Sequence, residues 1–157
     1  METKKNWMIY VNPTKYNLLG AVREFGAELP WGFMSDGIGK DDTVYFYLTG
    51  TEAETKDYQI HSAIFKNTFK RFVFKGRIKE VLDSIDIRDE KYWTDGNHDN
   101  EPQKHYALVE ITDFIYDCDI SSEDLKDFSW GKTATLEMDS GTAQIIENKI
   151  NKKRNGI

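Results

Sequence analysis

The sequence predicts an α+β domain in which a curled mixed β-sheet, or a small barrel, carries helices on its outside. Five or more short segments rich in β-branched and aromatic residues are separated by polar turns, and few segments have helical spacing. Strands and helices do not alternate regularly along the chain. A length of 157 residues with 39% hydrophobic content suits one domain, which we place at residues 1–150 with a polar tail or linker at 151–157.

The first half of the chain contains three predicted strands and one predicted helix. Strands are expected at 7–11, 30–34 and 43–49, and the last of these has the highest β-propensity in the chain. Residues 17–25 have apolar positions at helical spacing between a capping asparagine and a terminating glycine. Glycine and aspartate residues at 37–42 indicate a turn.

The second half contains a long polar segment between its predicted elements. Residues 83–105 are polar and acidic, and a loop of this length in a compact domain is usually functional or disordered. Residues 59–70 fit neither helical nor strand periodicity well. The predicted elements are strands at 71–74, 76–82 and 106–116, a short helix opening at Ser121 and a C-terminal helix after Ser140-Gly141-Thr142.

Charge and cysteine content exclude several classes of protein. A formal net charge of −6 excludes a uniformly basic nucleic-acid-coating surface, although it allows a local basic patch. Cys118 is the single cysteine, which excludes an intrachain disulfide and a cysteine zinc cage and suits a reducing compartment. The apolar run at 7–11 is too short for a signal peptide or a membrane span. We therefore expect a soluble cytoplasmic protein without a membrane partner.

Signatures of catalysis are weak. Nucleophile elbows and phosphate-binding glycine loops are absent from the sequence. In residues 95–99, side chains with oxygen ligands stand at alternate positions, as in a calcium loop. Asn100 and Tyr106, however, occupy the positions where such a loop needs glycine and glutamate. We expect no catalytic residue, metal or cofactor in this chain. A small metal-dependent nuclease that uses the Asp95–Asp99 loop is kept as an alternative.

A basic stripe is the most informative charge pattern. No acidic residue occurs between Lys66 and Lys79, and phenylalanines are interleaved with the cations. Such a stripe can neutralise phosphates of a nucleic-acid backbone, or it can be the solvated face of a strand pair. The six cations, which we call the basic stripe, are Lys66, Lys70, Arg71, Lys75, Arg77 and Lys79.

Two tryptophans stand out by their positions. Trp31 precedes a glycine in a short strand, and Trp93 lies in the long polar loop. Two rings from separate elements can sandwich a planar base, and each stacking contact is worth about 1–3 kcal/mol. Core packing of Trp31, and a loop pinned to the sheet by Trp93, are the structural alternatives.

The order of these pieces resembles the EVE domain, a PUA-like fold related to the YTH domain. The resemblance is carried by the run from Trp7 to Asn12-Pro13, by Trp31-Gly32-Phe33, and by Gly39-Lys40-Asp41-Asp42 before a strong strand that ends at Gly50. Ser140-Gly141-Thr142 and the helix after it are similar to the closing segment of that family. The resemblance covers residues 6–50 and, more loosely, 106–148, whereas 51–105 depart from the family pattern.

The resemblance implies a non-enzymatic domain that holds a flipped, modified base in an aromatic pocket. DNA is favoured over RNA as the partner, with the chain as the recognition module of a restriction system whose motor or nuclease portion is fused or separate. An RNA-binding PUA-like protein is the alternative from the same fold. By position, Trp31 matches one wall of the pocket; Trp93 is the candidate for the second wall, and Tyr47, Asn12 and Gly32 are candidates for the pocket floor. The basic stripe would hold the backbone on either side of the base.

Overall fold

The computed structural model describes residues 4–11, 28–33, 37–48, 71–82, 105–115, 118–125 and 135–155. In this part of the chain it has six strands, one 3₁₀ helix and one α-helix, so the α+β prediction is confirmed. The elements are β1 (Asn6–Val11), β2 (Glu28–Phe33), β3 (Thr43–Leu48), β4 (Arg71–Leu82), β5 (His105–Phe114), η5 (Ser122–Leu125), β6 (Thr135–Met138) and α3 (Ser140–Arg154).

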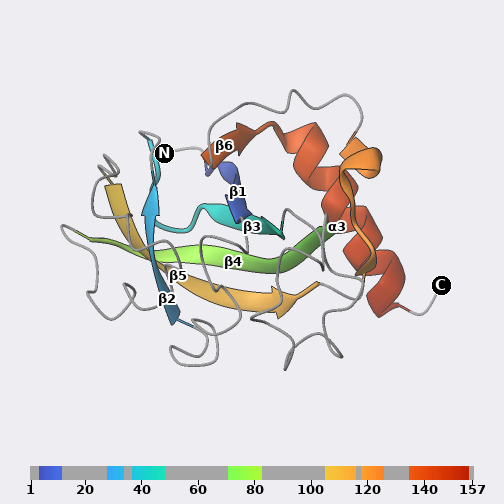
Figure 1. Ribbon diagram of the computed structural model, residues 1–157, viewed down its shortest axis with the longest axis horizontal. Coiled ribbons are helices and arrows are strands. Elements are labelled where there is room, and N and C mark those ends of the chain that lie inside the picture. Colours follow the sequence, from blue (N-terminus) through green and yellow to red (C-terminus); the bar gives the residue numbers. More distant parts are fainter. Residues whose placement is uncertain are drawn as a thin grey trace, which may run out of the picture.

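All six strands belong to one mixed sheet with the order β2-β5-β4-β3-β1-β6. The β1–β3 pair is parallel, and the other neighbouring strands are antiparallel. Strands β2 and β6 are the two edges, they lie apart in Figure 1, and no described residues pair them. The expectation of a barrel or strongly curled sheet was therefore wrong: the sheet is open, because closure requires the edge strands to meet.

Both faces of the sheet are buried along its centre. In β3, Val44, Phe46 and Leu48 point to one face, while Tyr45 and Tyr47 point to the other, as the two-residue period of a strand requires. An apolar run without polar alternation is typical of a strand with both faces covered, which explains why 43–49 could be recognised from the sequence.

Two clusters of buried side chains follow from this alternation. The first, called the Trp31 cluster, comprises Trp7, Ile9, Leu29, Trp31, Val44, Phe46, Leu48, Val73, Phe74, Ile78, Ala107, Val109 and Ile111. The second, called the helix-side cluster, lies between the sheet and α3, which Figure 1 shows beside one end of the sheet. It comprises Met8, Tyr45, Tyr47, Phe72, Ile115, Cys118, Ile120, Leu125, Met138, Ala143, Ile146 and Ile150.

Helix α3 is fixed at both ends. Asp139 is its N-cap and accepts a hydrogen bond from the backbone N–H of Thr142 at 2.6 Å. Ile146 and Ile150 are buried against the sheet, whereas Ile145 is exposed. The helix continues past residue 150 to Arg154, whose guanidinium donates hydrogen bonds to the Phe114 carbonyl and the Asp113 carboxylate. Residues 151–154 of the segment expected to be a tail are therefore helical.

Replacing Asp139 by alanine is expected to lower the melting temperature at neutral pH. The backbone N–H of Thr142, with the Thr142 side chain, holds the pKa of Asp139 below its ordinary value of 3.8. A lowered pKa means that the stabilisation is complete above the ordinary value and is lost as the pH falls through the folded-state pKa. Thermal unfolding followed by circular dichroism should therefore show a gap between wild type and variant that closes in acid. Asp139→Asn, which retains a capping oxygen, is the control; an equally large loss in this variant would contradict the capping role.

Strand β4 is longer than the sequence suggested. The predicted runs 71–74 and 76–82 form a single strand with irregular register beside Gly76. A side chain at Gly76 would lie 2.8 Å from the Glu110 carbonyl oxygen, so glycine permits the close approach of β5. The predicted helix at 17–25, the undecided segment 59–70 and residues 83–104 of the predicted 83–105 loop lie outside the described residues, whereas His105 is the first residue of β5. The described helices include none long and apolar enough to cross a membrane.

Candidate functional site

Trp31 lies on the edge strand β2, where it pairs in register with Ala107 of β5. Its side chain is only 7% exposed and belongs to the Trp31 cluster. The indole packs edge-to-face on Phe46, with ring centroids 5.4 Å apart and planes at 82°. The ring is therefore braced by the core and presents little of its surface to solvent.

Tyr47 lies on the opposite face of the sheet from Trp31. Its ring makes edge-to-face contacts with Phe72 at 5.1 Å and with Tyr10 at 5.8 Å between centroids, all on the helix side. Burial, followed by the nearby Tyr47 phenol, raises the pKa of Tyr10 to about 12. Because the sheet separates them, Trp31 and Tyr47 do not line one common pocket.

The other predicted pocket residues are less informative. Gly32 follows Trp31 in β2 and pairs in register with Tyr106 of β5. Asn12 and Trp93 lie outside the described residues, so the expected second wall of the pocket stays a prediction.

The basic stripe is neutralised where the structure describes it. Lys66 and Lys70 lie outside the described residues. The other four cations each contact a carboxylate from another element: Arg71 with Asp119 at 2.6 Å, Lys75 with Glu147 at 2.8 Å, Arg77 with Asp41 at 2.6 Å and Glu110 at 3.3 Å, and Lys79 with Glu28. These pairs tie neighbouring elements together, which favours the structural interpretation of the described part of the stripe. Partly exposed pairs of this kind contribute only about 0–1 kcal/mol each.

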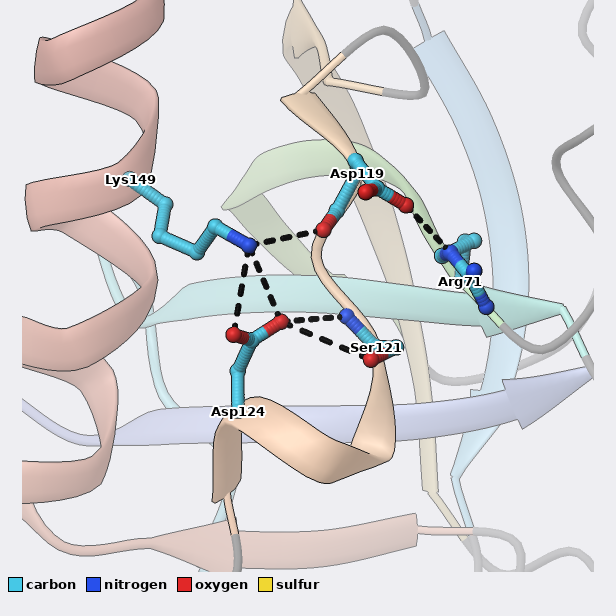
Figure 2. A network of polar contacts seen from close by, with 5 residues as sticks. All are labelled: Arg71, Asp119, Ser121, Asp124 and Lys149. Atoms are coloured by element: carbon cyan, nitrogen blue, oxygen red, sulfur yellow. Dashed lines mark hydrogen bonds and ion pairs between the residues drawn. The ribbon is translucent and has the colours of Figure 1, made fainter.

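Two ion pairs, Lys149–Asp124 and Arg71–Asp119, join α3 and β4 to the segment around η5. Figure 2 shows Lys149 of α3 donating to the Asp119 carbonyl and to the carboxylate of Asp124, which also accepts from the Ser121 N–H at 2.9 Å. Burial alone would raise the pKa of Asp124, but the Ser121 N–H and Lys149 outweigh it and lower that pKa. Arg71 binds the Asp119 side chain from β4. The bond from the Ser121 N–H to Asp124 resembles a helix cap, to which Lys149 adds an ion pair. A structural role is therefore sufficient to explain why these polar residues lie together.

A second polar contact lies under α3. The buried Tyr45 hydroxyl donates to Glu147 at 2.5 Å, and the other carboxylate oxygen of Glu147 accepts from Lys75 at 2.8 Å. Burial, followed by the bond to Glu147, raises the pKa of Tyr45 strongly. Tyr45 is therefore a neutral donor that positions α3 on the sheet.

The turn between β2 and β3 is built around a buried carboxylate. Asp42 is 4% exposed and accepts three hydrogen bonds, from the Lys5 N–H at 3.0 Å, the Trp7 indole N–H at 2.9 Å and the Gly39 N–H at 2.9 Å. Backbone bonds from Thr43 to Lys5 and from Ile78 to Asp42 join the same turn to β1 and β4. The predicted turn at 37–42 is thus confirmed, and its aspartate is the anchor.

A groove of about 660 Å³ opens beside this turn. Its lining includes Lys4 and Lys5 before β1 together with Gly37, Gly39 and Lys40 of the turn. Sequence reasoning did not single out these lysines. No local sequence signal marks them, because it is the parallel β1–β3 pair in the folded sheet that brings the residues before both strands to the same end.

Among the described residues, no group of three or more histidine, cysteine, aspartate or glutamate side chains could hold a metal ion. Asp95 to Asp99, the basis of the nuclease alternative, lie outside that part of the chain. No protein-family model matches the chain, and no curated protein matches it in sequence. The similarity to the EVE domain therefore stays a prediction.

Proposed function

We propose that this chain is a non-enzymatic, PUA-like domain that binds nucleic acid and recognises a modified base, primarily on DNA. Support comes from the order of elements along the chain, namely β1, β2 with Trp31, the turn anchored by Asp42 and the strand β3. The resemblance to the EVE domain rests on this same order. The motor or nuclease activity of a restriction system would then reside in a fused or separate partner.

The observation that carries the proposal is the placement of Trp31. Its ring lies on an edge strand and is held edge-to-face by Phe46, which fixes its orientation, but at 7% exposure a face of the ring must be uncovered before a base can stack on it. Stacking of a flipped base on such a ring contributes about 1–3 kcal/mol, and burying one methyl group adds about 0.8 kcal/mol. Base flipping costs a few kcal/mol, so discrimination between the modified and the unmodified base depends on these contacts and on hydrogen bonds to the base edge.

Binding to a matched series of oligonucleotides tests the proposal. Fluorescence anisotropy would compare one DNA sequence in unmodified, cytosine-methylated and adenine-methylated forms, and the corresponding RNAs. We expect at least about tenfold tighter binding to one modified DNA, which corresponds to about 1.4 kcal/mol. Equal affinity for all forms would refute base recognition. A preference confined to RNA would favour the RNA-binding alternative.

The nuclease alternative makes a different prediction. Incubation of labelled DNA with the protein and Mg²⁺ or Mn²⁺ should leave the DNA intact if the chain only binds. Cleavage that is lost in Asp95→Ala would instead support a metal-dependent nuclease.

A further inference from the structure

We propose that the groove between the N-terminal end of β1 and the 37–42 turn binds a phosphate group of a nucleic-acid backbone. The identity of the nucleic acid rests on the proposed function, whereas phosphate recognition rests on the groove itself. The groove replaces the described part of the basic stripe as the backbone contact, because the cations of that part are already paired with carboxylates.

Three lysines from two separate segments, Lys4, Lys5 and Lys40, line the groove. Lys4 and Lys40 are exposed and form no ion pair with any residue in the ranges that the structure describes. Lys5 lies beside the turn, because a side chain on Gly37 would come within 2.8 Å of the Lys5 Nζ. Its carboxylate neighbour, Glu137, is 3.9 Å away and half exposed. Lysines with weak or no partners are free to neutralise phosphate charges.

The two aspartates of the groove are already engaged. Both oxygens of Asp42 accept N–H groups, from Lys5 on one side and from Trp7 and Gly39 on the other. Asp41 accepts from the Arg77 guanidinium at 2.6 Å. The Arg77 guanidinium therefore compensates the charge of Asp41, and the three lysines of the lining outnumber the remaining negative charge of Asp42.

The turn that carries the groove is also connected to the Trp31 cluster. Ile38 packs against that cluster, and Trp7, which belongs to it, donates its indole N–H to Asp42. A volume of about 660 Å³ has room for a phosphate with part of its sugar. A nucleic-acid strand with one phosphate in the groove would thus lie at the edge of the Trp31 cluster.

The double variant Lys4→Ala/Lys40→Ala tests the site in the full chain. Each phosphate that is no longer neutralised should reduce the slope of log K against log salt concentration by about 0.9 on duplex DNA, so the double variant, which removes two lysines from one phosphate site, should lose about 0.9. Lys152→Ala/Lys153→Ala, which removes two exposed charges from the end of α3, is the matched control and should leave the slope near the wild-type value. An unchanged slope in the groove variant, or an equal loss in the control, would overturn the site.

Titration with inorganic pyrophosphate separates this proposal from the proposed function. In a ¹⁵N-resolved NMR spectrum, the amide signals of Gly37 and Gly39 should shift in the wild type and stay in place in the groove variant. If no oligonucleotide binds but these signals shift, the nucleic-acid function fails and the phosphate site stands. If oligonucleotides bind while the signals stay in place, the site fails and the function stands.

Discussion

Asp42→Ala is expected to lower the free energy of unfolding by about 3–5 kcal/mol, since it removes the acceptor of three N–H groups, one of them the buried Trp7 indole. A buried donor left without an acceptor costs about 1–3 kcal/mol, and the two partly buried backbone donors can recover some of their loss from water. The change is a large fraction of the 5–15 kcal/mol that is typical of a domain. Urea denaturation at neutral pH measures it.

Two further variants test whether the carboxylate geometry is the cause. Asp42→Asn can keep its oxygen toward Trp7 and Gly39 but turns an amide toward the Lys5 N–H, so we expect an intermediate loss. Asp41→Asn is the neighbouring control: it removes one partly exposed ion pair and keeps a residue that tolerates the observed φ of 74°. If Asp41→Asn were as damaging as Asp42→Ala, the anchoring role of Asp42 would be wrong.

The described strands were largely predictable because their composition is locally decisive. The run at 43–49 has apolar side chains on both faces of a strand, so it needs cover on both sides, and it forms the inner strand β3. The two runs predicted at 71–74 and 76–82 form one continuous strand, because Gly76 admits the close approach of β5 without ending its own strand. Strand β6 escaped notice, since four residues at an edge carry too little pattern to be recognised.

Strand order and sheet closure depend on contacts distant in sequence, which no local pattern encodes. The parallel β1–β3 pair and the insertion of β4 and β5 between β3 and β2 are of this kind. The same limit applies to the candidate site. A run of cations from 66 to 79 is visible in the sequence, but their carboxylate partners come from distant segments such as Glu28, Glu110 and Glu147.

Asp42 shows how tertiary context assigns a role to an ordinary residue. As part of a glycine- and aspartate-rich turn it could be predicted to lie in a turn, yet nothing nearby in the sequence indicates that Trp7, 35 positions away, would donate to it. The lysine groove depends on the same contact, because Asp42 fixes the turn that carries Lys40 beside Lys5. Loss of Asp42 should therefore weaken the groove as well as the fold.

Trp31→Ala is expected to lower the free energy of unfolding by about 3–5 kcal/mol, because the side chain is 7% exposed and removing it leaves a cavity against Phe46. This result would differ from the simplest expectation for a base-stacking wall, namely loss of binding with an intact fold. Chemical denaturation measures the change. A loss below about 1 kcal/mol would show that the indole is not part of the packed core.

Trp31→Phe separates the two roles of this position, since it retains a ring against Phe46 and should leave the protein folded. Phe72→Leu is the matched control: it also trims a buried aromatic side chain, but in the helix-side cluster on the other face of the sheet. If Trp31 stacks on the base, Trp31→Phe should reduce the ratio of modified to unmodified affinity, and Phe72→Leu should leave that ratio unchanged. Equal ratios in both variants would assign Trp31 to the core alone and require a different residue for the base-binding wall.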